Sequence, residues 1–292
     1  MKVNDVFNIL EKYNITFDYL ITNENLEINN VAQIYSIKNN AISFIDHILN
    51  IDEYNIPSVN NLIIHPIVDR NLLASLPKGN YIFTEYVKIS FVYVMNEILL
   101  QKENIKYETK IKSNVIIGKN TFIGDNVEIG ENVKISSNCV INNAIIGNNV
   151  NIYSGVIIGD DGFGYLRERD KSIIKFPHIG KVVIQDNVEL HSGVCIARGT
   201  LGDTLLKTGV KCDNMVHIAH NDIIGKHTMI AAKTMISGSV KIGDYCWISP
   251  GCSIIDGIEI ADNTFIGIGS VVLKDIKNTG EVWYGCPARK KI

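Results

Sequence analysis

The stretch LKTGVKCDNMVHIAHNDIIGKHTMI (Leu206–Ile230) carries an aliphatic residue or a cysteine at every sixth position. The same spacing continues without a break to Val272. The positions in this run are Leu206, Cys212, Ile218, Ile224, Ile230, Ile236, Ile242, Ile248, Ile254, Ile260, Ile266 and Val272. Earlier hexads occupy Ile117–Ile141, Ile146–Ile158 after a shift of one residue, and Ile184–Ile196. This spacing fits neither an amphipathic helix, in which hydrophobic residues recur about every 3.6 positions, nor a half-buried strand, in which hydrophobic and polar residues alternate.

Two further regularities accompany this spacing. The residue after the aliphatic is usually small, as at Gly225 and Ala231, and the residue four after it is usually Val, Thr, Ser or Cys, as at Thr228. Six residues therefore make one short strand and one tight corner, and three such sides close a triangular coil of about 18 residues. The pattern predicts a left-handed parallel β-helix, since two-residue corners escape the right-handed preference of longer crossovers.

The predicted fold class is mainly β, with a small α/β domain before the β-helix and a short tail after it. We expect residues 1–105 to form the α/β domain, 106–273 the β-helix and 274–292 the tail. In the first domain a helix is expected from Asp5 to about Tyr13, and another from Ile89 to Gln101. Strands are expected at AISFID, NLIIHP and NYIFTE. Two segments interrupt the hexads, namely Asp160–Gly180 and Ala197–Leu205, and such loops often carry function.

Composition excludes several classes of protein. The 292 residues carry a net charge of only -3, which gives no bulk reason to expect nucleic acid or an anionic membrane as partner. The apolar run Ile89–Leu100 is shorter than the roughly 20 residues that span a bilayer. MKVNDVFNIL lacks the features of a signal peptide.

The six cysteines contain no C-x-x-C pair. Cys212, Cys246 and Cys252 fall on hexad slots, where packing explains them, because buried free cysteine behaves as a small hydrophobic residue. We therefore expect reduced thiols and a cytoplasmic location.

His220 is the histidine that the hexads place on an outward corner, two residues after the inward Ile218. Gly238 follows eighteen residues later, one coil further along the same side. An imidazole stacked beside a free backbone N–H is the pair that acyl transfer needs, a general base and an oxyanion donor. The alternative is that His220 is simply a polar residue on the face of the β-helix.

Asp222 occupies a slot that usually holds Val, Thr, Ser or Cys. Because an unpaired carboxylate in a tight bend is costly, it either accepts hydrogen bonds from corner amides or orients His220 or a substrate amine. The spacing disfavours a zinc site, since His217 and His220 are three residues apart on an extended side and point in different directions. No metal and no tightly bound cofactor are therefore expected.

The tail ends VWYGCPARKKI. Trp283 and Tyr284 could stack on an adenine, and Arg289, Lys290 and Lys291 could bind the phosphates of coenzyme A. The alternative is that these basic residues bind no ligand and are simply exposed to solvent.

Three segments, IGDDGFGY (Ile158–Tyr165), HIGKVVIQDNVEL (His178–Leu190) and CDNMVHIAHNDIIG (Cys212–Gly225), resemble the hexapeptide-repeat acyltransferases. Among these the similarity is to the UDP-3-O-acylglucosamine N-acyltransferases of lipid A synthesis and to N-acyltransferases of nucleotide-linked amino sugars. The resemblance implies that His220 is the base, Gly238 the oxyanion donor and Asn214 a contact to the acyl donor. It implies that Phe44 stacks on the pyrimidine of a nucleotide bound to the first domain, and that the protein is a homotrimer with active sites between β-helices.

Three departures from the lipid A pattern shape the functional prediction. The ending GCPARKKI resembles that of sugar acyltransferases that use coenzyme A, Ala197 and Gly257 stand where the family has an acidic residue and a histidine, and Asn50 stands where it has an aromatic. We therefore expect an enzyme that moves an acyl group from a coenzyme A thioester to the amine of a dTDP- or UDP-linked amino sugar, for bacterial surface glycans. The alternatives are the lipid A pathway N-acyltransferase with hydroxyacyl-acyl carrier protein as donor, and a non-catalytic β-helix scaffold.

Overall fold

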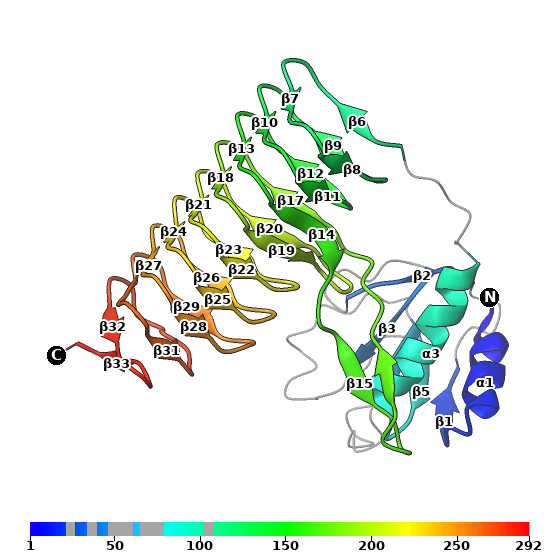
Figure 1. Ribbon diagram of the computed structural model, residues 1–292. Helices are drawn as coiled ribbons and strands as arrows, with labels where there is room; N and C mark the ends of the chain where they lie inside the picture. The colour runs from blue at the N-terminus through cyan, green and yellow to red at the C-terminus, as the bar shows by residue number, and fades with distance from the viewer. Residues whose placement is uncertain (22–26, 34–39, 46–60, 65–78, 102–107, 292) are drawn as a thin grey trace. The chain divides into compact units, whose positions relative to one another are not determined.

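The chain forms two compact units in a computed structural model that describes residues 1–21, 27–33, 40–45, 61–64, 79–101 and 108–291. The N-terminal unit comprises Met1–Ile105 together with Tyr165–Pro177. The β-helix unit comprises Lys106–Gly164 and His178–Ile292. Within the second unit, short strands stack coil upon coil from β6, in green, to β33, in red (Figure 1).

Three parallel sheets line the β-helix, one for each side of the triangular coil. The β6–β29 face contains β6 (Lys110–Ile111), β9 (Glu128–Ile129), β12 (Ala144–Ile146), β17 (Val182–Ile184), β20 (Thr204–Leu206), β23 (Ile223–Ile224), β26 (Lys241–Ile242) and β29 (Glu259–Ile260). The β8–β31 face contains β8 (Phe122–Ile123), β11 (Val140–Ile141), β14 (Ile157–Asp161), β19 (Cys195–Arg198), β22 (His217–Ile218), β25 (Met235–Ile236), β28 (Ser253–Ile254) and β31 (Val271–Val272). The β7–β33 face contains β7 (Ile116–Ile117), β10 (Lys134–Ile135), β13 (Asn151–Ile152), β18 (Glu189–Leu190), β21 (Lys211–Cys212), β24 (Met229–Ile230), β27 (Trp247–Ile248), β30 (Phe265–Ile266), β32 (Val282–Tyr284) and the antiparallel β33 (Arg289–Lys290). The left-handed parallel β-helix predicted from the hexads is confirmed.

The hexad aliphatics fill the interior of the coils, as predicted. In the two-residue strands from β9 to β31 the second residue points inward and is buried, and its partners one coil away are the same kind of residue, as in the pair Ile218 and Ile236. Burying one such side chain stabilises the fold by about 1.5–3 kcal/mol, so the column of aliphatics supplies most of the driving force of this unit. Ile117 is an exception at 41% exposed, because β7 is the terminal strand of its sheet.

Asparagine marks many corners of the early coils. Asn114, Asn132 and Asn149 have left-handed backbone dihedrals, with φ of 58°, 56° and 56°. Asparagine tolerates this conformation better than other non-glycine residues. Their side chains also form a ladder from Asn114 to Asn132 to Asn149, at 3.2 and 3.3 Å. The corner side chains thereby pair with one another from coil to coil.

The N-terminal unit is an α/β layer, as expected. Its sheet has the order β1-β5-β4-β3-β2, in which β1 is antiparallel to β5 and the other pairs are parallel. The strands are β1 (Asp18–Leu20), β2 (Asn30–Val31), β3 (Ala41–Ile45), β4 (Asn61–Ile64) and β5 (Asn80–Phe83), and the helices are α1 (Val3–Lys12) and α3 (Val87–Leu100). Asn50 lies outside the described residues. No described helix is both long and apolar enough to cross a bilayer.

The longer interruption is a β-hairpin that belongs to the N-terminal unit. It consists of β15 (Tyr165–Arg167) and β16 (Ile173–Lys175), paired antiparallel. Phe176, just after the hairpin, packs its ring 6.4 Å from that of Phe44 and 6.2 Å from that of Phe91. Residues 165–177, which lie within the span 106–273 expected for the β-helix domain, therefore group with the other unit, where Phe176 is buried.

Candidate active site

His220 lies on the corner that joins β22 to β23, between the β8–β31 and β6–β29 faces. The inward Ile218 and Ile224 anchor the two ends of this corner in the core. Asn221 turns the chain with a φ of 65°, and its N–H donates to Thr204 Oγ1 at 2.9 Å. The backbone of the corner is therefore fixed from both sides while the imidazole stays half-buried.

Gly238 lies directly against the His220 imidazole. A Cβ built on Gly238 would be 2.6 Å from Cε1 and 2.8 Å from Nε2 of that ring, closer than real Cβ atoms approach. The backbone link between the two coils is a hydrogen bond from Ser239 N to the His220 carbonyl, 2.9 Å long. The ring can lie this close to the corner only because residue 238 has no side chain.

The Gly238 N–H is free to bind a ligand. Among the hydrogen bonds of the described residues, none uses this donor. The equivalent corner position two hexads later is Pro250, which has no N–H, so the ladder does not require a donor there. An unoccupied backbone donor beside an imidazole is the geometry predicted for a base and an oxyanion donor.

Asn221 determines which nitrogen of His220 carries the proton. Asn221 Nδ2 donates to Gly202 O at 3.0 Å, and its Oδ1 accepts from the Thr200 N–H at 3.0 Å, so the amide orientation is set by its partners. The same Oδ1 lies 3.1 Å from His220 Nδ1. Because Oδ1 is an acceptor, Nδ1 must carry the hydrogen in the neutral ring, which leaves the lone pair on Nε2, beside Gly238.

Asp222 is a corner residue and not a surface group. Its side chain is fully buried, with Oδ2 accepting from Ala219 N at 3.0 Å and Oδ1 from Val240 N at 2.9 Å. It thus ties the His220 corner to the Gly238 corner one coil away. Burial raises the pKa of the Asp222 carboxyl to about 9, although the hydrogen bonds from the two backbone N–H groups act to lower this pKa. The first of the two sequence-based alternatives is the one seen, and the assignment of Asp222 to substrate binding is wrong because no atom of it reaches the surface.

Two residues near His220 were not among the predicted site residues. His178 is buried, and its ring lies edge-on to His220 with centroids 5.6 Å apart. A Cβ on Gly162 would be 2.9 Å from His220 Cδ2 and 3.1 Å from His178 Nε2. Both belong to segments quoted for the family resemblance, DDGFGY and HIGK, which was the available signal.

Asn214 lies apart from His220 within the β-helix unit, and Phe44 belongs to the N-terminal unit. Asn214 is on the corner between β21 and β22, at the opposite end of the same side, and its Nδ2 bonds its neighbour Asp213 at 2.9 Å. Phe44 is a half-buried residue of β3 in the N-terminal unit, with its ring 4.8 Å from that of Phe91. Their predicted contacts to the acyl donor and to a pyrimidine remain predictions.

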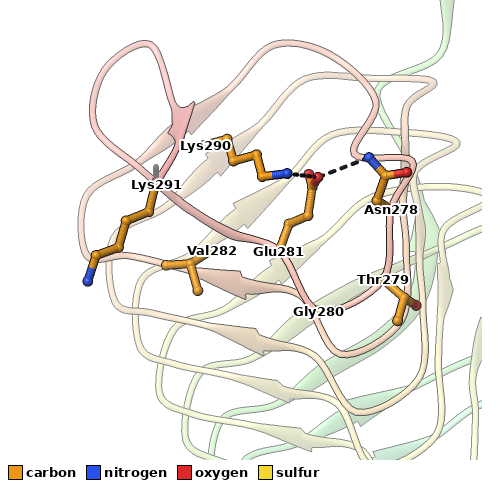
Figure 2. A pocket seen from close by; sticks show the side chains of 7 residues that line it. All are labelled: Asn278, Thr279, Gly280, Glu281, Val282, Lys290 and Lys291. Atoms are coloured by element: carbon orange, nitrogen blue, oxygen red, sulfur yellow. Dashed lines mark hydrogen bonds and ion pairs between the residues drawn. The ribbon is translucent and has the colours of Figure 1, made fainter.

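The tail does not present the surface expected for coenzyme A. Trp283 is buried because it pairs with the inward Ile266, and its Nε1 donates to Glu281 Oε2 at 2.8 Å. Lys290 Nζ bonds Glu281 Oε1 at 2.7 Å, as Figure 2 shows, while Lys291 extends away from the pair. A hollow of about 390 Å³ lies here, and three of its polar lining residues, Asn278, Glu281 and Lys290, bond one another.

Three side chains near the end of the chain donate hydrogen bonds to Glu281. Its carboxylate accepts from Lys290, Asn278 and Trp283, and these hydrogen bonds, with that of Lys290 the largest, lower its pKa to about 2. The exposed Arg289 donates to the neighbouring carbonyl of Ala288 at 3.3 Å. Trp283 thus has a structural role in the core and Lys290 pairs with Glu281, whereas Arg289 and Lys291 stay on the surface, and phosphate binding by the three basic residues remains a prediction.

Metal ligands do not gather in the part of the chain that the structure describes. No group of three or more His, Cys, Asp or Glu side chains there has the arrangement of an ion site. Burial lowers the pKa of His217, which extends outward from β22 in register with Cys195.

Comparison with known proteins agrees with the repeat. Residues 108–143 and 239–274 match the family described as bacterial transferase hexapeptide (six repeats). The chain is a hexapeptide-repeat protein. Its fold is similar to solved structures of LpxA from Acinetobacter baumannii (26% identity, TM-score 0.57, 63% of this chain and 69% of that one) and of the UDP-N-acetylglucosamine acyltransferase from Francisella novicida (28%, 0.56, 63% and 66%).

Curated relatives of this hexapeptide-repeat protein share its sequence over a shorter span. The UDP-3-O-acylglucosamine N-acyltransferase of Shewanella denitrificans is 54% identical over 129 residues, which are 44% of this chain and 38% of the relative. That of Coxiella burnetii is 46% identical over 129 residues, with the same shares. The match thus covers well under half of either relative.

These names correct the predicted substrate. Relatives at 46 and 54% identity are named for UDP-3-O-acylglucosamine, the sugar of the alternative prediction. The main prediction, a coenzyme A-dependent enzyme for dTDP- or UDP-linked amino sugars of surface glycans, is therefore wrong. It depended largely on the tail, where Trp283 and Lys290 serve the fold.

Proposed function

We propose that this protein is an N-acyltransferase that transfers an acyl group from a thioester to the amine of UDP-3-O-acylglucosamine. The observation that carries the proposal is the placement of His220 Nε2 against the Gly238 corner, where the N–H is unused. The names of the relatives support this class of acceptor.

The reaction follows from this geometry in two steps. The amine nitrogen attacks the thioester carbonyl while Nε2 of His220 accepts a proton from it, so that a C–N bond forms and the carbonyl oxygen becomes an oxyanion. The Gly238 N–H donates to that oxyanion. The intermediate then collapses, the C–S bond breaks, and the proton held by His220 passes to the leaving thiolate, which restores the neutral base.

The donor proposed here is a hydroxyacyl group carried on acyl carrier protein. It is the donor of the alternative prediction. Trp283 is buried and Lys290 bonds Glu281, so two of the residues expected to bind coenzyme A make contacts within the fold.

The protein is also proposed to be a homotrimer, as the family resemblance implies. Asn214 and His220 lie at opposite ends of one side of a coil, on either end of β22. In a three-fold ring the Asn214 corner of one subunit meets the His220 corner of the next, because a cyclic interface joins two different patches. The donor contact and the base then act together at each subunit interface.

The test is an acyl-transfer assay with matched donors and acceptors. Purified protein is incubated with UDP-3-O-acylglucosamine and either hydroxyacyl-acyl carrier protein or hydroxyacyl-coenzyme A, and the amide product is followed by mass spectrometry. We expect efficient transfer from the carrier protein and a kcat/KM at least about tenfold lower from coenzyme A. An acceptor lacking the 3-O-acyl chain serves as control. Lack of product with both donors would contradict the proposal and favour a scaffold.

A further inference from the structure

The imidazole of His220 is held on three sides by separate parts of the β-helix unit. Asn221 contacts Nδ1, Gly238 lies against Cε1, and Gly162 lies against the opposite edge, where a Cβ would be 2.9 Å from Cδ2. His178 lies behind Gly162, with its ring at 79° to that of His220. Nε2 is the ring nitrogen with no protein hydrogen bond among the described residues.

We propose that Gly162 and His178 are positioning residues that press the His220 ring against Gly238 and so aim Nε2 at the acceptor amine. The proposal rests on the function proposed above, because it assigns His220 as the base. Neither residue is required to touch substrate.

The backbone before Gly162 is shaped for this contact. Strand β14 pairs with β19, and its register shifts between Ile158 and Asp160, which is a β-bulge. The extra residue is Gly159, with a φ of 84°, and a Cβ there would lie 1.6 Å from Asn142 O, so no other residue fits. Bulges re-aim the end of a strand and are common beside active sites. Here the bulge directs Gly162 onto His220.

Arg198 contacts both ends of the inserted segment that separates Gly162 from His178. Its Nε donates to Gly180 O at 2.7 Å, and its Nη1 lies 4.0 Å from the Asp161 carboxylate. The Arg198 side chain is only 15% exposed, so this bridge is largely protected from solvent. The inserted segment departs from the coils after Gly162 and rejoins them at His178. Because Arg198 fixes both ends, Gly162 and His178 are held rigidly beside His220.

The direct variant is Gly162→Ala. Its methyl group would collide with the Cδ2 edge of His220 and with Nε2 of His178, so the His220 ring must move by a few tenths of an ångström. Displacements of about 1 Å at a reacting group cost on the order of 10²-fold in rate. We expect kcat to fall about 10- to 100-fold with the KM for the sugar changed less than about twofold.

Three further variants separate positioning from folding. Gly251→Asn changes a corner glycine that has open space around it and a φ of 69°, which asparagine tolerates, and it should leave kcat unchanged. His178→Gln retains a polar group near the position of Nε2 and should keep more activity than His178→Ala. Melting temperatures of all variants are measured in parallel to identify any that fail to fold.

The decisive comparison is made in a His220→Ala background. If Gly162 acts through His220, Gly162→Ala lowers kcat in the parent but not in His220→Ala. An equal loss in both backgrounds would overturn the proposal, because Gly162 would then act on substrate or on the fold directly.

A spectroscopic readout separates this inference from the proposed function. Nuclear magnetic resonance of ¹⁵N-histidine-labelled protein, with His220→Ala to assign the signal, distinguishes the Nδ1–H from the Nε2–H ring. We expect Nδ1–H for His220 in the parent and a mixture in Gly162→Ala. An inactive parent with this difference would refute the proposed function and leave the positioning role standing. The same tautomer in both proteins, with kcat unchanged, would refute the positioning role.

Discussion

Asn221 Oδ1 lies 3.1 Å from Nδ1 of His220, and the same oxygen accepts hydrogen bonds from the backbone and the hydroxyl of Thr200. One amide therefore sets the tautomer of the proposed base and also anchors the loop between β19 and β20. Because the Asn221 amide is held by Gly202 O as well, the His220 ring and this loop are coupled.

Removing the Asn221 side chain should impair catalysis more than folding. Asn221→Gly suits the φ of 65° and deletes the partner of Nδ1, so both tautomers of His220 become populated. We expect kcat to fall about 10- to 100-fold, whereas Asn221→Asp, which still accepts from Nδ1–H, should retain more activity. Asn263→Gly, at another left-handed corner with a φ of 55°, is the control. Equal effects of the Asn221 and Asn263 changes would argue against a role for the tautomer.

Asp222 should make stability depend on pH. Its pKa is raised to about 9 by burial, whereas in the unfolded chain it is near 3.8. Well below pH 3.8 the carboxyl is protonated in both states, and as pH rises from there toward 9 only the unfolded state releases the proton. This contribution to the free energy of unfolding therefore falls across that window, with a slope of at most about 1.4 kcal/mol per pH unit.

The matched variant for this effect is Asp222→Thr. Thr228 occupies the equivalent slot, where its Oγ1 accepts from Cys246 N at 3.0 Å and donates to Gly243 O at 2.8 Å. A threonine at 222 can make the same links without an ionisable group. Thermal unfolding at pH 5 and pH 8 should show the melting temperature of the parent falling relative to that of Asp222→Thr. Parallel pH profiles would mean that Asp222 does not titrate in this way.

Mixed trimers test whether neighbouring subunits share the site. His220→Ala and Asn214→Ala should each be nearly inactive as pure proteins if the base and the donor contact come from different chains. Co-expressed in equal amounts, they should recover activity at about a quarter of the interfaces, because each complete site needs one subunit of each kind on the correct sides. If the mixture is no more active than the two pure variants, the base and Asn214 do not come from different subunits.

The hexads predict the fold because each one specifies a side of the coil by itself. Each hexad contains an inward aliphatic, a small residue and a β-branched residue, and this pattern is compatible with few conformations other than a two-residue strand followed by a corner. Stacked coils then repeat the same unit. His220 and Gly238 were predicted as neighbours for the same reason, since eighteen residues make one coil. Asp222 was placed on its corner by the cost of burying an unpaired carboxylate.

The remaining parts of the site depend on features that break the repeat. Gly162 reaches His220 through a bulge and His178 through the return of a hairpin, and neither displacement follows from a period of six. Trp283 is seventeen residues after Ile266 and still pairs with it, because β32 enters the sheet one residue out of phase. Because of that shift, the Trp283 side chain, which was expected to stack on a ligand, lies in the core.

The most direct test of the central claim is the single-turnover rate of acyl transfer by His220→Ala, measured with saturating acyl-carrier thioester and UDP-3-O-acylglucosamine. The control is His227→Asn, a corner histidine with a φ of 54°, a conformation that asparagine also accepts. We expect His220→Ala to lose about 10² to 10⁴ in rate with its melting temperature retained, and His227→Asn to stay within about threefold of the parent. A His220→Ala rate within threefold of the parent would contradict the assignment of His220 as the base.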